Sequence, residues 1–157
     1  MNYFKILKFK FISSVILIAS LFTACQNYSE AELASFDKEI TAYLKEKNIL
    51  AESTETGLYI SIQEEGNGEK IPFDAIIKVN YRGYLTNGRP FDVHMDKPVD
   101  LEIKRLVPGW REAMLYLSKG SKATLFIPPH LGYKTQEQKE IPANSILIFD
   151  IHIIDVN

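Results

Sequence analysis

The stretch IKVNYRGYLTNGRPFD, residues 77–92, decides the fold of this chain. Its first half alternates between two kinds of side chain, which is the period of a half-buried β-strand. The inward set is Ile77, Val79 and Tyr81, and the outward set is Lys78, Asn80 and Arg82. Asn87-Gly88 follows and is a strong hairpin signal, because both central positions of a type I′ turn need positive φ. The stretch therefore predicts two antiparallel strands joined by a tight turn.

Other strand-like segments lie on both sides of this hairpin. They are LYISIQE, VDLEI, KATLFIP and SILIFDIHIIDV, at residues 58–64, 99–103, 122–128 and 145–156. One short amphipathic helix interrupts them from about Trp110 to Ser118, and Gly120 is a C-cap signal for it. Its apolar face holds Trp110, Ala113, Met114 and Leu117. Because one helix covers only one face of a sheet, the pattern predicts an α+β domain, with a bent antiparallel sheet wrapped around one short helix.

The N-terminus has the layout of a secretory signal. Residues 1–24 hold three lysines, then an apolar run, then small residues, and the apolar run is shorter than the roughly 20 residues of a membrane span. Cys25 is the only cysteine and stands at the expected cleavage point. We expect residues 1–24 to be a lipoprotein signal peptide and Cys25 to be lipid-modified. The alternative is a plain signal peptide followed by a coincidental cysteine.

A second amphipathic helix is predicted at about residues 30–47, as part of a tether over residues 25–56. Ser29 and Glu32 form a capping box, and the apolar stripe is Leu33, Phe36, Ile40, Tyr43 and Leu44. We expect this stripe to pack on the domain that follows, the alternative being pairing with a second copy. Residues 50–57 are polar and are interpreted as a linker to the domain at 57–157.

Charge and composition exclude several classes of function. The 157-residue chain has a net charge of −2, and without residues 1–24 it carries −5, so no nucleic-acid partner is expected. There is no phosphate-binding glycine loop, no Cys-x-x-Cys and no histidine pair at metal-ligand spacing. The three histidines are scattered and are interpreted as ordinary surface or core residues. We therefore expect no metal and no cofactor.

Aromatic residues remain as the candidates for a site. They come from five separate elements, and Asp92 is adjacent to one of them: Tyr81, Phe91, Trp110, Tyr133 and Phe149. Such a set suits an apolar ligand held by a few polar groups. The residues alone leave a second interpretation open, in which the aromatics only form the core.

Four motifs resemble the FKBP-type peptidyl-prolyl cis-trans isomerases over about residues 57–157. They are IKVNYRGYLTNGRPFD, LVPGWREAM, KATLFIPPHLGY and IPANSILIFDIHII, in that order. The resemblance implies a bent antiparallel sheet around one helix. The signal-like N-terminus and the helix that follows it make the chain similar to the envelope lipoproteins of that family in Gram-negative bacteria. The resemblance to the family also implies proline-containing polypeptide clients, macrolide inhibitors, no cofactor and a monomer.

The resemblance also implies roles for individual residues. Tyr81, Phe91 and Asp92 would line one wall, and Trp110 would form the floor beneath the proline ring. The backbone N–H of Val107, preceded by Leu106, would bind a ligand carbonyl. The hydroxyl of Tyr133 would hydrogen-bond the substrate. Ile141 would form part of the rim of the pocket, and Phe149 part of its wall. The assigned catalytic residues are Tyr81, Asp92, Trp110, Tyr133 and Phe149.

Several positions depart from the family pattern. Val99, assigned to substrate binding with Phe91, Leu106, Val107 and Ile141, stands where a phenylalanine is common, which implies a thinner wall. Arg105 replaces an acidic residue, Lys134 replaces a glycine, and the segment 134–140 is unusually charged. These departures bear on substrate preference and macrolide affinity.

The sequence thus predicts a prolyl isomerase that assists folding of extracytoplasmic proteins. We expect it to be lipid-anchored in the cell envelope, at the outer membrane facing the periplasm. The alternatives are a non-catalytic module that binds proline peptides as a chaperone or assembly subunit, and a structural lipoprotein with an ordinary aromatic core.

Overall fold

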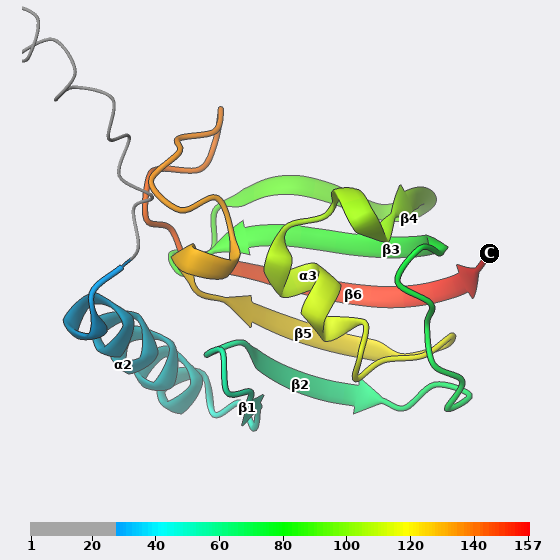
Figure 1. Cartoon of the computed structure of the whole chain (residues 1–157), viewed down its shortest axis with the longest axis horizontal. Coiled ribbons are helices and arrows are strands. Elements are labelled where there is room, and N and C mark those ends of the chain that lie inside the picture. The colour runs from blue at the N-terminus through cyan, green and yellow to red at the C-terminus, as the bar shows by residue number, and fades with distance from the viewer. Residues whose placement is uncertain (1–27) are drawn as a thin grey trace, which may run out of the picture.

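The computed structural model describes residues 28–157 and shows one antiparallel sheet with helices on both of its faces (Figure 1). The strands are β1 (Glu52–Ser53), β2 (Tyr59–Glu64), β3 (Ile76–Leu85), β4 (Pro90–Glu102), β5 (Lys122–Ile127) and β6 (Leu147–Val156). Their order in the sheet is β1-β2-β5-β6-β3-β4. The helices are α2 (Glu30–Lys47) and α3 (Pro108–Ala113), with 3-10 turns at Ile103–Arg105 and Pro129–Leu131. The predicted α+β class is confirmed.

The inner face of the sheet carries the main core. Along β3 the buried residues alternate as predicted, with Ile77, Val79 and Tyr81 turned inward. Helix α3 lies across this face (Figure 1) and buries Trp110 and Ala113 in the same cluster. The apolar side chains on one face of α3 meet the inward side chains of the strands. One short helix therefore covers the core on the concave side of the sheet.

Helix α2 packs against one end of the opposite face of the sheet. The helix begins with the predicted capping box, in which the Ser29 N–H donates to Glu32 Oε2 at 2.8 Å and the Ser29 hydroxyl accepts from the Glu32 N–H at 3.3 Å. The C-terminal part of its predicted stripe packs on the sheet through Ile40, Tyr43 and Leu44, whereas Leu33 is exposed and Phe36 contacts Tyr28 instead. The buried cluster consists of Ile40, Leu44, Tyr59, Phe126, Ile146 and Ile148. The Tyr59 hydroxyl also donates to Asp37 at 2.5 Å, which ties the helix to β2.

The β3–β4 hairpin forms, but its turn differs from the predicted one. The Gly88 N–H donates to the Leu85 carbonyl at 2.8 Å, and the Leu85 N–H donates to the Arg89 carbonyl at 3.0 Å. Gly88 has φ +82°, whereas Asn87 does not have positive φ, so the expectation of two left-handed positions is wrong. The loop has three residues, which accommodates strand twist with a single left-handed residue. Asn87 instead accepts the Arg89 N–H at 2.9 Å.

The short helix also differs from its predicted bounds. It begins at Pro108 rather than Trp110, because proline suits the first helical position, where no N–H is needed. It ends at Ala113, after which the N–H of Tyr116 bonds the carbonyl three residues back and tightens the chain. Gly120 has φ +91° but donates to the Ile153 carbonyl, so it turns the chain into β5 and does not cap α3.

Residues 50–57 are more ordered than a linker. Glu52 and Ser53 pair with Ile60 and Tyr59 as strand β1, and the Thr54 N–H donates to Leu58 at 2.8 Å. Polar composition concealed this strand because it is short and exposed.

Residues 1–24 and Cys25 lie outside the described residues. Within residues 28–157, no helix combines the length and apolar character needed to cross a membrane.

Candidate active site

A cavity of about 470 Å³ opens on the inner side of the sheet, between α3, the β3–β4 hairpin and the segment 133–141. It is lined by Tyr81, Phe91, Asp92, Leu101, Arg105, Leu106, Val107, Trp110, Tyr133, Gln138, Lys139, Glu140, Ile141 and Phe149. The structure therefore brings together every residue assigned to the site from the sequence except Val99.

Val99 does not form part of the cavity wall. It lies opposite Val79 in the β3–β4 ladder and packs against the inner core. Its short side chain does not reach the cavity, whereas Leu101, two residues further along the same face of β4, does. The assignment of Val99 to the wall is corrected to Leu101.

Trp110 forms the base of the cavity. Its side chain is only 3% exposed, and its ring meets two others edge to face: that of Phe149 at 5.3 Å and that of Tyr81 at 5.7 Å between centroids. Phe91 continues the wall, with its ring edge to face with Phe149 at 5.4 Å. These contacts hold the rings in fixed orientations, so the aromatic residues are both core and cavity lining.

Gly83 makes this ring packing possible. A Cβ atom at this position would lie 2.5 Å from the Phe91 ring and 2.7 Å from the Phe149 ring. Position 83 therefore has to lack a side chain for the two phenylalanines to meet across β3. Sequence analysis missed this role, although an isolated glycine inside a strand signals a close approach of this kind.

Tyr81, Asp92 and His94 form a polar network at one side of the cavity. The Tyr81 hydroxyl donates to Asp92 Oδ2 at 2.5 Å, and His94 Nε2 lies 3.1 Å from Asp92 Oδ1. Burial, and then the hydrogen bond to Asp92, raise the pKa of Tyr81 far above its usual value, so its hydroxyl stays protonated. His94 was interpreted as an ordinary residue; in the structure it holds the second oxygen of Asp92.

Two further polar groups sit at the mouth of the cavity. Val107 is the N-cap residue of α3, and its carbonyl accepts from the Trp110 N–H at 3.0 Å. Its own N–H precedes the helix and is not used by the helical hydrogen bonds. Tyr133 is half-buried, and burial followed by the nearby charge of Asp92 raises the pKa of its hydroxyl. Both groups are therefore able to donate to a bound carbonyl.

The segment 134–141 closes one end of the cavity. Lys134 has φ +57°, which explains why glycine suits this position; its N–H donates to Pro129 and its carbonyl accepts from Asn144. Arg89 in the hairpin loop donates to the Glu140 carbonyl at 2.8 Å and ties the segment to the β3–β4 turn. Sequence analysis missed this tie because it joins residues 51 positions apart.

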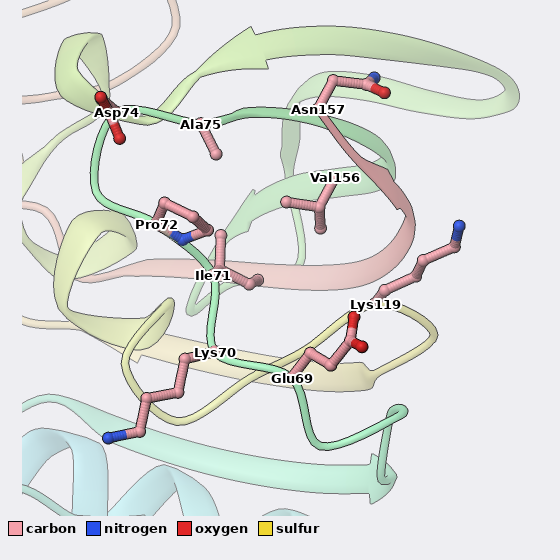
Figure 2. A pocket seen from close by; sticks show the side chains of 9 residues that line it. All are labelled: Glu69, Lys70, Ile71, Pro72, Asp74, Ala75, Lys119, Val156 and Asn157. Atoms are coloured by element: carbon pink, nitrogen blue, oxygen red, sulfur yellow. The ribbon is translucent and has the colours of Figure 1, made fainter.

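A second cavity, of about 580 Å³, lies beside the C-terminal end of β6 (Figure 2). Its lining mixes Ile71 and Pro72 with charged side chains such as Glu69 and Lys119, and it includes no aromatic ring. Within residues 28–157, no group of histidine, cysteine, aspartate and glutamate side chains is arranged to hold a metal ion. Because its lining brings the aromatic rings together, the aromatic cavity is the better candidate for the active site.

The fold and the cavity define an FKBP-like domain, in which a bent antiparallel sheet holds an aromatic pocket over one short helix. The model of the family described as FKBP-type peptidyl-prolyl cis-trans isomerase matches residues 67–154. The chain therefore belongs to the FKBP-type peptidyl-prolyl cis-trans isomerases.

Curated relatives carry the same family name. The chain is 44% identical to the FKBP-type peptidyl-prolyl cis-trans isomerase FkpA of Buchnera aphidicola subsp. Acyrthosiphon pisum over 105 residues, which is 66% of this chain and 44% of the relative. It is 33% identical to a probable FKBP-type peptidyl-prolyl cis-trans isomerase of Haemophilus influenzae over 144 residues, 90% of this chain and 59% of the relative. The chain thus spans about half the length of these relatives.

Solved structures agree with this assignment. The crystal structure of FkpA from Escherichia coli superposes with a TM-score of 0.69 at 31% identity, covering 82% of this chain and 62% of that one. The crystal structure of AtFKBP13 superposes with a TM-score of 0.63 at 29% identity, covering 69% of this chain and 99% of that one.

Proposed function

We propose that this protein catalyses cis-trans isomerisation of Xaa-Pro bonds, with the proline ring over Trp110. The observation that carries the proposal is the aromatic base of the cavity, where three edge-to-face ring contacts present an apolar surface. A ring-sized apolar group fits such a surface, and no ionisable catalyst is needed beside it.

The chemistry follows from the amide itself. Rotation about the bond breaks its resonance, and the uncatalysed event takes tens to hundreds of seconds. A planar amide is more polar than a twisted one. Transfer from water to an apolar cavity therefore costs the planar form more free energy than the twisted form. Only this difference accelerates the step, and each tenfold gain requires about 1.4 kcal/mol.

The polar groups position the substrate. The N–H of Val107 and the hydroxyl of Tyr133 would donate to carbonyls flanking the proline and hold the peptide in a turn. Tyr81 donates to Asp92, and His94 holds the other carboxylate oxygen. This network fixes the Asp92 carboxylate at one side of the cavity, where it would either orient Tyr81 or meet the carbonyl of the twisted bond. No proton is transferred and no covalent intermediate forms.

The cellular setting is a further part of the proposal. The signal-like residues 1–24 and Cys25 support lipid anchoring in the cell envelope, at the outer membrane facing the periplasm, where the protein would assist folding of extracytoplasmic clients. Metabolic labelling with a radioactive fatty acid tests the anchor. Label should enter the wild-type chain and be lost in Cys25→Ser.

Isomerase activity is tested with the purified full chain and proline tetrapeptides. Cis-to-trans conversion should be faster than the spontaneous rate and should fall at least tenfold in kcat/KM for Trp110→Ala. Leu115→Ser is the matched control, because Leu115 lies just beyond the same helix, is 72% exposed and does not line the cavity. Circular dichroism is used to check that Trp110→Ala keeps the wild-type fold. Conversion at the spontaneous rate by the wild-type protein contradicts the proposal.

The rival is a non-catalytic binding module. Gln138, Lys139 and Glu140 line the cavity with polar and charged groups, which lessen the apolar character on which the proposed catalysis depends and still allow a polypeptide to bind. The same purified protein separates the two functions. Tryptophan fluorescence that shifts on adding a proline peptide, without faster isomerisation, supports the module.

A further inference from the structure

Strand β2 lies at an edge of the sheet that is only partly covered. Its one outer neighbour among residues 28–157 is β1, which pairs with Tyr59 and Ile60 alone (Figure 1). In an antiparallel sheet the backbone groups of alternate residues face the same side. Because the Leu58 carbonyl faces β1 and accepts the Thr54 N–H, the N–H and carbonyl of Ile62 face the uncovered edge. This edge offers a donor and an acceptor to another strand.

An apolar groove runs along the uncovered edge. It has a volume of about 450 Å³ and lies between β2, the chain leading into β1, and Tyr116. Its apolar side chains are unusually open to solvent: Leu50 is 91% exposed, Tyr116 52% and Ile62 38%. We call this surface, with Glu52 and Glu65, the edge groove. It combines free backbone groups with apolar contact area, the two requirements for adding a strand.

The charge of the edge groove restricts its occupant. Glu52 and Glu65 are the charged side chains that line it, and no lysine or arginine does so. The neighbouring Glu64 is neutralised by Lys122 at 2.8 Å, so it adds little to the field. A basic residue on the incoming segment would complement the two free glutamates. A second copy of this chain would bring the same glutamates together and is disfavoured by repulsion.

We propose that the edge groove binds an extended, basic and apolar segment of an unfolded polypeptide, which adds as a short strand beside Ile62. The segment needs no proline. A register shift between Ile62 and Glu64 ends the regular ladder, so the added strand is short and the complex is reversible. The edge groove lies at the β1–β2 end of the sheet, whereas the aromatic cavity is built on β3 and β4 at the other end. The two sites therefore act on different parts of a client.

Binding is tested with the full chain and a fluorescent eight-residue peptide of alternating valine and threonine with a lysine at each end. We expect saturable anisotropy, weakened at least tenfold by Leu50→Ser combined with Ile62→Lys. Leu115→Ser is the matched control and should change the Kd less than twofold. A peptide with glutamates at its ends, and one N-methylated along its backbone, should each bind at least tenfold more weakly. Isomerase activity of the double variant should equal that of the wild type.

Four results of the peptide assay would overturn the proposal. They are an absence of saturable binding, a Kd unchanged in the double variant, displacement of the peptide by a proline peptide that occupies the aromatic cavity, and equal binding of the acidic peptide. Sedimentation analysis tests whether a second copy of this chain occupies the edge groove instead. A dimer that the double variant dissociates would identify a second copy as the partner and would also overturn it. Because isomerisation is measured separately, failure here leaves the proposed enzymatic function intact.

Discussion

Replacement of Gly83 by alanine tests how tightly the active cavity is packed. The new Cβ would lie 2.5 Å from Phe91 and 2.7 Å from Phe149, while ordinary contacts begin near 3.4 Å. Each ring therefore has to retreat by about 0.7 to 0.9 Å. Gly83 has no positive φ, so alanine fits the backbone and the effect arises from the side-chain clash alone.

The clash should affect stability and activity together. Overpacking of this size costs about 1–3 kcal/mol, so the Tm should fall by several degrees. Because Phe149 contacts Trp110, the displacement reaches the base of the cavity. A shift approaching 1 Å can reduce catalysis by up to about 100-fold, and we expect a loss of kcat/KM of about tenfold or more for a proline tetrapeptide.

A double variant distinguishes this clash from general damage. Gly83→Ala combined with Phe91→Leu places a smaller side chain opposite the new methyl group. The two changes should be non-additive, with a coupling energy of about 0.5–3 kcal/mol in thermal or urea unfolding. A Gly83→Ala protein with wild-type Tm and wild-type kcat/KM would refute the reasoning, as would strict additivity in the double variant.

Three further changes probe other contacts. Burial and the hydrogen bond to Asp37 raise the pKa of Tyr59 to about 12, so its contribution to stability is complete below pH 10 and is lost as pH rises through 12; in Tyr59→Phe, urea unfolding should show a shallower decline over that range, and an identical decline would contradict this. Lys134→Gly relieves a left-handed residue at φ +57° and should raise the free energy of unfolding by about 0.5–1 kcal/mol in urea, whereas a loss would count against it. Arg89→Ala removes the hydrogen bond to the Glu140 carbonyl, which contributes about 0.5–1.5 kcal/mol to stability. The variant should show a KM raised about threefold and faster amide hydrogen exchange in residues 136–141. Unchanged exchange would show that the bond does not hold this segment.

Most residues assigned from the sequence line one cavity, because they lie in short, distinctive motifs. Each motif places one or two side chains at the end of a strand or helix, and the fold brings those ends together. The placement of Val99 in the cavity wall differs from the structure, because the position of a residue in the chain does not reveal how far its side chain reaches toward a cavity. His94 was missed because its role depends on Asp92, which is two residues away on the same strand and accepts from Tyr81 across the hairpin.

The sequence by itself determined the elements whose signals are local. Alternation in β3, the capping box of α2 and the apolar face of α3 each arise from neighbours along the chain, so their periods can be read without coordinates. Only the tertiary structure decided the long-range contacts: the rings that meet over Gly83, the Arg89–Glu140 tie and the uncovered edge beside Ile62. These depend on strand order and register, which are set by packing of residues distant in sequence. The only local trace of them is Gly83, which marks a close approach within its strand but does not say which side chains approach.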